Sequence, residues 1–193
     1  MTTGSPLWYL ARGTGVVSLA LLTATVLLGL TSVTRWRSAR WPRFVTVSLH
    51  RNISLLSVVF LVVHIGSSVL DTYTKISLTD AFVPFVGSYR PFWLGLGALA
   101  FDLILALIVT SLIRVRLGLR IWRSVHWLAY AAWPVAVLHG LGTGTDASQR
   151  WMQLFTLTCI GLVGLAGLRR LVVEDADDAP VVVLAARERA GVR

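Results

Sequence analysis

Five long apolar stretches constrain the fold of this chain more than any other feature of its sequence. They cover residues 7–33, 45–70, 92–113, 124–141 and 151–171. About 20 apolar residues in helical form cross the roughly 30 Å hydrocarbon layer of a membrane. Strands in lipid would leave backbone groups unpaired, and these stretches lack the alternating pattern of a barrel strand. The sequence therefore predicts an all-α integral membrane bundle of about five transmembrane helices.

Composition agrees with lipid as the surrounding solvent. With 55% hydrophobic and 14% charged residues, a chain of 193 residues would expose a large apolar surface as a soluble globule. The formal net charge of +9 could suggest nucleic acid, but the arginines lie between the apolar stretches and form no basic surface interleaved with aromatic residues. We therefore expect membrane lipid, and no nucleic acid, among the partners. The single cysteine, Cys159, excludes a disulfide framework and an iron–sulfur ligand set.

The length of the chain leaves no room for a second folded domain beside five spans. We expect residues 1–172 to form one membrane domain and residues 173–193 to form a short cytoplasmic tail, a loose extension with an acidic patch. The segment before the first apolar stretch has no basic residue, and the stretch is longer than a signal-peptide core. We expect it to remain as a span of a multi-pass protein of the cell (plasma) membrane.

Basic residues gather in the connections after the first and third stretches, whereas the other connections have few. The arginines concerned are Arg35, Arg37, Arg40, Arg43, Arg114, Arg116, Arg120 and Arg123. Because connections rich in arginine stay in the cytoplasm, the amino terminus is expected outside and the carboxyl terminus inside. The long connection of residues 71–90 is then outside, where it could cap the bundle.

All four histidines lie within or at the ends of the second and fourth stretches, two in each. Ionisable residues inside a membrane are costly and indicate function by default. His50 and His64 are 14 residues apart, which is about 21 Å of helical rise and only about 40° away from a shared face. His126 and His139 are 13 residues apart, which leaves them about 140° out of phase in an ideal helix. Pro134 lies between them and can kink the helix, so we expect the correction there.

The two histidine stretches are separated by one crossing and should therefore run parallel. The histidines at equal depth are then His50 with His126 and His64 with His139. One imidazole from each of two facing helices can hold a haem iron from both sides, which leaves no open coordination position and favours electron transfer. Lone membrane histidines often only hydrogen-bond to neighbouring helices, and zinc would need Cys, Asp or Glu ligands beside each pair. Four histidines matched by depth favour two bis-histidine haems b.

Several segments together carry a resemblance to a known family. The histidine segments are LHRNISLLSVVFLVVHIG and WRSVHWLAYAAWPVAVLHG, and they are accompanied by LARGTGVVSLALLTATVLLG, RPFWLGLGALA and TSLIRVRLGLRIWR. With these segments the chain resembles the ferric reductase-like transmembrane family, which includes the membrane domains of NADPH oxidases and ferric reductases and the haem subunit of bacterial methionine sulfoxide reductase systems. The spacings of 14 and 13 residues are those of the NADPH oxidase haem helices. The resemblance covers residues 7–170.

The resemblance implies a bundle that passes electrons outward through two b haems. His50 and His126 would hold the inner haem, and His64 and His139 the outer one. Oxidases and reductases of the family carry a flavin and nicotinamide domain after the last span, whereas this chain ends shortly after its own. We therefore expect no flavin or nicotinamide site here, and a separate donor that is either a cytoplasmic flavoprotein reductase or a membrane quinol. The acceptor on the outer side is left open.

Other residues are candidates for supporting the haems. Propionates are anionic and need basic partners, and Arg51 and Arg123 flank the inner ligands. Arg12 enters the first stretch near the outer leaflet, where reaching the lipid headgroups is an equal alternative. Trp133 lies between the two ligands of its stretch, either as an aromatic between the haems or as an ordinary core residue. Asp102, near the middle of the third stretch, is expected to be a hydrogen-bonded neutral acid.

The sequence thus predicts the electron-transfer subunit of a membrane oxidoreductase. The apolar stretches hold no nucleophile beside a base and no open metal site, so we expect no catalytic residue and only outer-sphere delivery of electrons. The alternative is a non-redox membrane scaffold or transporter subunit that retains the haem-family fold. That alternative predicts a colourless protein.

Overall fold

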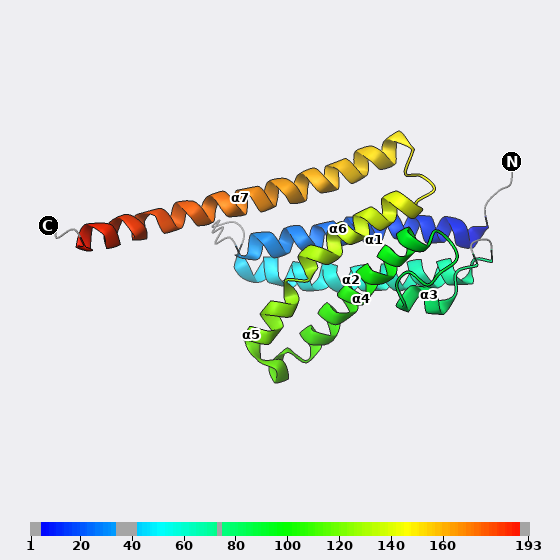
Figure 1. Ribbon diagram of the computed structural model, residues 1–193, viewed down its shortest axis with the longest axis horizontal. Coiled ribbons are helices and arrows are strands. Elements are labelled where there is room, and N and C mark those ends of the chain that lie inside the picture. The colour runs from blue at the N-terminus through cyan, green and yellow to red at the C-terminus, as the bar shows by residue number, and fades with distance from the viewer. Residues whose placement is uncertain (1–4, 34–41, 73–74, 190–193) are drawn as a thin grey trace.

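The computed structural model describes residues 5–33, 42–72 and 75–189, and Figure 1 shows their arrangement. Across these ranges the elements are α1 (Pro6–Val33), α2 (Arg43–Leu70), α3 (Leu78–Phe82), α4 (Pro91–Leu112), α5 (Arg114–His126), α6 (Ala129–Thr143) and α7 (Arg150–Arg189). The described ranges contain no strand, and the prediction of an all-α fold is confirmed.

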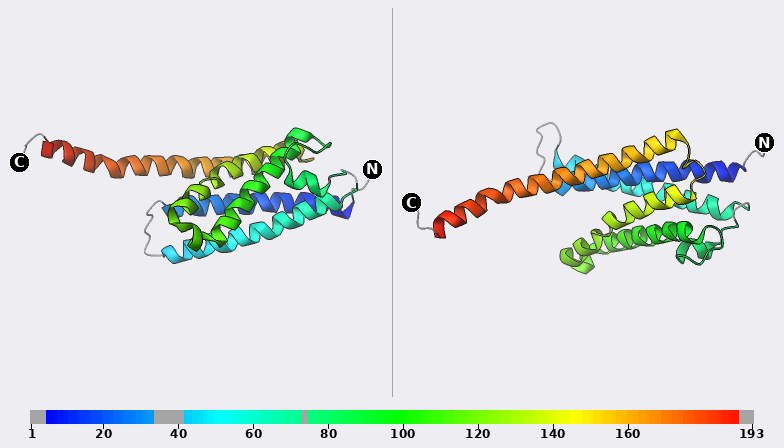
Figure 2. Two further views of the ribbon diagram at one scale, coloured as in Figure 1. Left: turned by 60° about the horizontal axis from the view of Figure 1, so that its bottom comes forward. Right: turned by 45° about the horizontal axis from the view of Figure 1, so that its top comes forward.

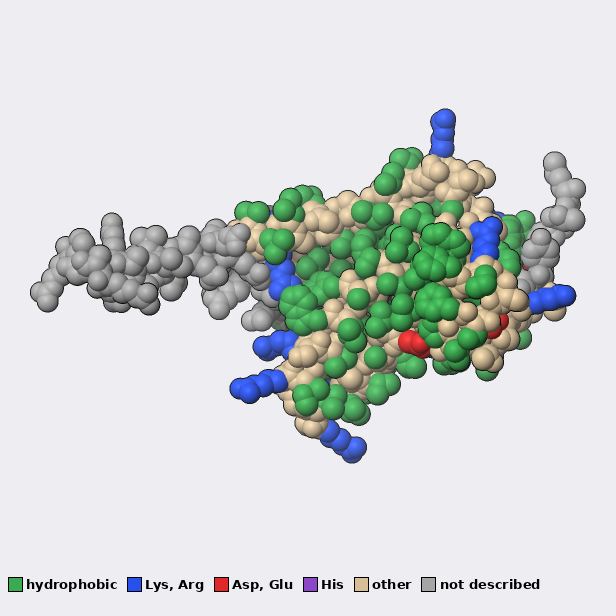
Figure 3. Space-filling view, viewed as in Figure 1, with side chains coloured by type: hydrophobic (Ala, Val, Ile, Leu, Met, Phe, Trp, Pro, Cys, Tyr) green, Lys and Arg blue, Asp and Glu red, His purple; other side chains and the backbone are tan. Residues whose placement is uncertain are grey.

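Four helices among the described residues are long and apolar enough to cross a membrane. These spans are Pro6–Thr31, Phe44–Leu70, Pro91–Leu112 and Arg150–Val172. In the most apolar part of each span, no more than 28% of the residues are buried, so most of the apolar surface faces outward. Figure 3 shows hydrophobic side chains over the middle of one face and basic side chains at its edges. Such an exterior suits a bilayer, and the helical membrane bundle is confirmed.

The fourth predicted span, residues 124–141, is divided in the structure. α5 ends at His126 and α6 begins at Ala129, while Trp127 and Leu128 between them keep right-handed helical angles. α6 has 15 residues, fewer than the roughly 20 that a full crossing takes. A complete span therefore requires the last turn of α5 together with α6.

The two histidine helices, α2 and α6, run in the same direction but are held apart by their neighbours (Figures 1 and 2). α2 packs along α1, and α6 packs against α4 and α1, whereas α2 and α6 have at most a marginal contact in the part of the chain that is described. The core lies instead between α1, α6 and α7. Its buried residues are Leu19, Val26, Leu30, Trp133, Val137 and Cys159. The parallel course predicted for the two histidine helices is therefore present, although the two helices hardly contact each other.

The described part of the connection between α2 and α4, residues 71–72 and 75–90, folds over one end of the bundle, where the sequence suggested a cap. Its short helix α3 begins with a capping box, in which Ser77 and Asp80 bond reciprocally to each other's backbone N–H. Phe82 packs edge-on against Phe101 of α4, with 5.3 Å between ring centroids. Arg90 adopts a left-handed conformation with φ 42° and donates a hydrogen bond to the carbonyl of Gly142 at 2.6 Å. The cap is thus attached to α4 and to the end of α6.

α7 is the longest helix, with 40 residues, and it continues to Arg189. The tail expected from residue 173 is therefore helical as far as that residue, and in Figure 1 it extends beyond the other helices. Three of the arginines in the first basic connection, Arg35, Arg37 and Arg40, lie outside the described residues.

Asp102 lies at the middle of α4 and is half-buried. The sequence predicts a hydrogen-bonded carboxyl group at this position. In the structure this carboxyl group has no hydrogen bond or ion pair with any other described residue. Leu105 and Val109, three and seven positions further on, lie on the same side of the helix and are exposed. The carboxyl group therefore lies toward the outer surface of α4 rather than toward the histidines.

Candidate functional site

The structure brings the four histidines together in the two expected pairs. The ring centroids of His50 and His126 are 6.2 Å apart with 62° between the ring planes, and those of His64 and His139 are 6.4 Å apart with 78° between the planes. Two metal–nitrogen bonds of about 2 Å each, with the distance from each nitrogen to its ring centre added, come to about 6 Å. Each pair is therefore spaced to hold one metal ion between its two rings.

Three of the four histidines use the second ring nitrogen to bond to a neighbouring helix. The Nδ1 atoms of His50, His64 and His139 lie 3.1, 2.8 and 2.9 Å from the backbone carbonyls of Thr25, Ala11 and Trp93. Because a carbonyl oxygen only accepts, each Nδ1 carries the proton and each Nε2 keeps a lone pair. Such a bond orients a histidine for metal binding and makes it a stronger ligand.

A glycine lies beneath the ring of each of these three histidines. Gly29, Gly15 and Gly97 pack against His50, His64 and His139, and each glycine comes four residues after the carbonyl that its histidine bonds to. Gly15 and Gly29 are 14 residues apart on α1, which is the spacing of His50 and His64 on the antiparallel α2. The sequence alone did not link these glycines to the histidines, although the matched spacing of 14 was a signal for Gly15 and Gly29; for Gly97 the sequence indicated only close packing between helices.

His126 is held differently from the other three. Its Nδ1 atom is buried and has no hydrogen-bond partner among the described residues. Its ring instead stacks on Trp122, with 4.9 Å between centroids and 29° between planes. The Trp122 Nε1–H in turn donates to Ser111 Oγ of α4 at 3.3 Å. Trp122, for which the sequence predicts only a place at the membrane interface, is therefore the side chain that orients this histidine.

A tight turn between α5 and α6 helps to bring His126 and His139 to one side. The N–H groups of Leu128, Tyr130 and Ala131 each bond to the carbonyl three residues earlier, as in a 3₁₀-helix. A 3₁₀ turn adds about 20° of rotation per residue over an α-helix, which reduces the mismatch of about 140° expected for a spacing of 13. This correction lies before Pro134, the residue at which the sequence suggested it.

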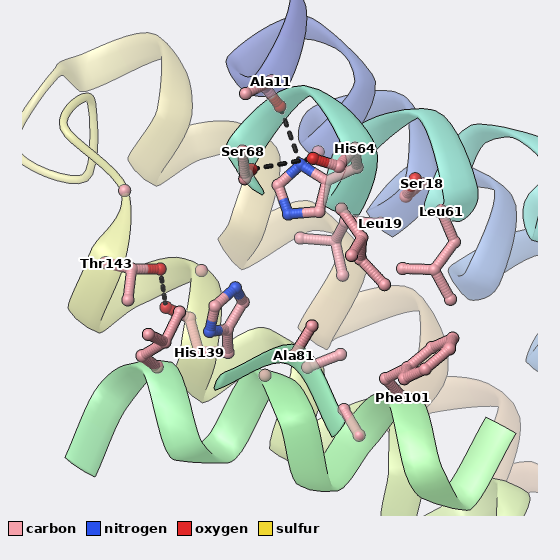
Figure 4. Close-up of a pocket in the computed structure, with 18 of the residues that line it drawn as sticks. Ala11, Ser18, Leu19, Leu61, His64, Ser68, Ala81, Phe101, His139 and Thr143 are labelled. Atoms are coloured by element: carbon pink, nitrogen blue, oxygen red, sulfur yellow. Dashed lines mark hydrogen bonds between the residues drawn. The ribbon is translucent and has the colours of Figure 1, made fainter. Parts of the chain in front are cut away.

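A cavity of about 280 Å³ lies between the rings of His64 and His139 (Figure 4). The two imidazoles enter it from α2 and α6, and Ala11 bonds to His64 at its edge. Most of the lining is apolar, and α3 and the rest of the cap contribute Ile76, Asp80, Ala81 and Tyr89. The cap thus covers the end of the bundle at which the His64–His139 pair lies.

The comparisons with known proteins agree with this geometry. The family model described as "Ferric reductase like transmembrane component" matches residues 14–137. The chain belongs to the ferric reductase-like transmembrane family. The match includes three of the four histidines and ends two residues before His139. Neither the curated proteins nor the solved structures gave a match. Membership of this family indicates transmembrane electron transfer as the general function.

The residues of this ferric reductase-like bundle fit a haem on several counts. The near absence of contact between α2 and α6, the paired imidazoles and the apolar cavity would suit an apolar macrocycle whose metal takes two protein nitrogens. Within the described residues, no group of three or more His, Cys, Asp or Glu side chains is placed to hold a metal ion. Each pair therefore offers two protein nitrogens, a set that suits a haem iron better than a zinc ion.

Of the three arginines proposed for the propionates, only Arg12 reaches the cavity. It lines the cavity beside His64, forms an ion pair with Asp146 and lies 4.0 Å from the ring centroid of Trp8. Arg51 and Arg123 are exposed on the surface near the other histidine pair. The structure thus places the Arg12 cation at the His64–His139 cavity, whereas the side chains of Arg51 and Arg123 lie exposed on the surface of the bundle.

Trp133 lies in the core between α1, α6 and α7 and does not line the cavity. It is 8% exposed, and its Nε1–H donates to Thr23 Oγ1 at 3.0 Å. Of the two roles considered for this residue, these contacts are those of the ordinary core residue.

Proposed function

We propose that this chain carries electrons across the membrane through two b-type haems, one bound by His50 and His126 and the other by His64 and His139. The observation that carries the proposal is the pair of facing imidazoles, found twice with ring separations of 6.2 and 6.4 Å. The two pairs are separated by 14 residues along α2, which corresponds to about 21 Å, so they lie at different depths of the bundle.

The haem irons would supply one-electron redox chemistry by alternating between the ferric and ferrous states. The paired histidines would be the two protein ligands of each iron, and the described residues around the pairs include no nucleophile beside a base. The backbone carbonyls of Thr25, Ala11 and Trp93 fix three imidazoles in the tautomer that binds a metal. Electron delivery to an acceptor outside the bundle, without chemistry on a bound substrate, is the activity that this arrangement favours.

We further propose that electrons enter at the His50–His126 pair and leave at the His64–His139 pair. Arg114, Arg116 and Arg120 of α5 are exposed at the first end, and arginine-rich connections favour the cytoplasm. The donor would be a separate cytoplasmic flavoprotein or a membrane quinol. The acceptor would approach the cap of residues 71–90 on the outer side, and the plasma membrane would be the location.

The experiment that tests the cofactor is a dithionite-reduced minus oxidised visible spectrum of the purified protein, with haem and polypeptide quantified in the same sample. We expect close to two haems b per chain, both with low-spin bands. Colourless protein from haem-replete cells would refute the proposal and would favour a membrane scaffold that has kept the family fold.

The donor is tested on reconstituted vesicles by comparing reduction rates with a quinol and with a reduced flavoprotein. The faster donor at equal driving force identifies the class. Negligible rates with both donors would contradict the two donor classes proposed for this chain.

A further inference from the structure

Three of the four proposed ligands share one local geometry on the helix that faces them. Each of His50, His64 and His139 bonds through Nδ1 to a carbonyl at position i of a neighbouring helix, and a glycine occupies position i+4. In an α-helix the Cα–Cβ bond leans toward the amino terminus, so a side chain at i+4 covers the turn that holds carbonyl i. A glycine at i+4 therefore leaves that carbonyl accessible to a ring from the next helix.

We propose that Gly15, Gly29 and Gly97 are positioning residues for the haem ligands, each keeping one helix carbonyl open for the Nδ1–H of its histidine. The inference rests on the proposed function, because it assigns these glycines to the haem sites. It explains why a histidine pair on α2 and a glycine pair on α1 have the same spacing. The same geometry occurs on α4, where Gly97 leaves the Trp93 carbonyl open to His139 of α6.

The three positions differ in how closely the ring approaches. A Cβ atom at position 97 would lie 2.5 Å from the ring of His139, so the ring would have to move. At position 15 the distance to the ring of His64 would be 3.0 Å, which requires a shift of a few tenths of an ångström. At position 29 the distance to the ring of His50 would be 3.6 Å, an ordinary van der Waals contact. The expected disturbance therefore decreases from position 97 to 15 to 29.

Both close approaches belong to the same pair. Gly15 and Gly97 lie beneath His64 and His139. At the other pair, Gly29 packs against His50 at an ordinary van der Waals distance, and no described glycine packs against His126. Adding a methyl group at position 97 or 15 should thus act on the haem held by His64 and His139 and leave the other haem as an internal reference in the same molecule.

The test compares Gly97→Ala, Gly15→Ala and Gly29→Ala with a control at Gly164, where a Cβ would have nothing within 4 Å. The measurements are haem per polypeptide, the low-spin ferric electron paramagnetic resonance signal and the midpoint potential of each site. His139→Ala and His126→Ala assign the signals to the two sites. Alanine also favours helix over glycine, so the control should be at least as helical as the natural chain.

We expect Gly97→Ala to shift the signal of the His64–His139 site and to raise its midpoint potential or empty that site. The reason is that loss of the Nδ1–H···O=C bond makes the imidazole a weaker donor to ferric iron. Gly15→Ala should act in the same direction by less, Gly29→Ala should cause the smallest change of the three, and Gly164→Ala none.

Two outcomes would overturn the inference while leaving the proposed function intact. One is a Gly97→Ala protein with two haems and signals equal to those of Gly164→Ala. The other is equal loss of both haems, which would mean that the glycine serves packing of the whole bundle. A natural chain without haem would instead refute the proposed function, and this inference with it.

Discussion

The two histidine pairs both consist of two facing imidazoles, but different contacts hold the rings in place. At the His64–His139 pair both rings bond to backbone carbonyls and lie on glycines, and the cavity between them is covered by the cap. At the other pair only His50 has such a bond, and His126 depends on stacking against Trp122. One site is therefore positioned mainly by main-chain atoms and the other partly by a single aromatic side chain.

The difference matters because main-chain and side-chain supports respond differently to change. A carbonyl inside a helix is fixed by the helix itself, so mutation of its residue leaves it in place. A stacked aromatic contributes about 0.5–1.5 kcal/mol and disappears when the side chain is replaced. The buried Nδ1 of His126 also has no described partner, so nothing there selects its tautomer. We expect the His50–His126 site to be the less constrained of the two.

Removing a ligand tests the pairs themselves and should have the largest effect. His139→Ala and His126→Ala should each lose about one of two haems, because in the proposed function each pair would supply both protein ligands of one iron. Haem per polypeptide, together with a redox titration, measures the result. Loss of both haems from either single variant, in a protein that remains folded, would contradict two separate sites.

Replacing Trp122 tests the side-chain support. Trp122→Leu removes the stacking contact, and we expect roughly fivefold weaker haem binding at the His50–His126 site, from about 1 kcal/mol. Trp122→Phe keeps an aromatic ring and should restore most of the affinity. Competition for haem by an apo-haemoprotein measures both. Trp151→Leu, an exposed tryptophan on α7, is the control. Equal affinities for all three variants would show that His126 needs no such support.

Changing the ion pair at the cavity tests whether the His64–His139 site has a cationic partner. Arg12→Gln removes a positive charge near the proposed propionates and should lower the midpoint potential of that site, whereas Asp146→Asn frees the Arg12 charge and should raise it. Both shifts should be smaller than that of Gly97→Ala, since the two side chains are partly exposed. Shifts of the same sign in both variants would indicate a structural role alone.

Replacing Trp133 should affect neither pair and gives the smallest change in potential. Trp133→Phe deletes the hydrogen bond to Thr23 and should cost about 1 kcal/mol of stability, seen as a fall of a few degrees in the melting temperature. Both midpoint potentials should stay unchanged. A change in either potential would support the alternative of an aromatic between the haems.

Much of the architecture could be predicted from residues near each other in the chain. The apolar stretches predicted the helices, and the spacing of His50 and His64 placed two histidines on one face of α2. The pairing of His50 with His126 followed from the parallel course of two helices separated by one crossing. Long apolar runs and helical periodicity are local properties, and lipid leaves few alternatives to a helix.

Other features depend on how helices rotate and shift against one another. The ion pair of Arg12 with Asp146 joins residues that are 134 positions apart. The 3₁₀ turn that helps to align His126 with His139 lies at the junction of α5 and α6, before Pro134. No proline or glycine marks this junction in the sequence, so the sequence could not predict it.

The sequence by itself determined the helical class of the fold, four of the five predicted spans, the order of the histidines along their helices and the family to which the chain belongs. Tertiary structure alone decided which carbonyl each Nδ1–H bonds to, that Gly97 on α4 serves a histidine on α6, and that Trp122 replaces such a bond for His126. The physical reason is that a helix carbonyl is a possible acceptor at every turn. Only the packed rotation of two helices selects the one that a neighbouring imidazole can reach.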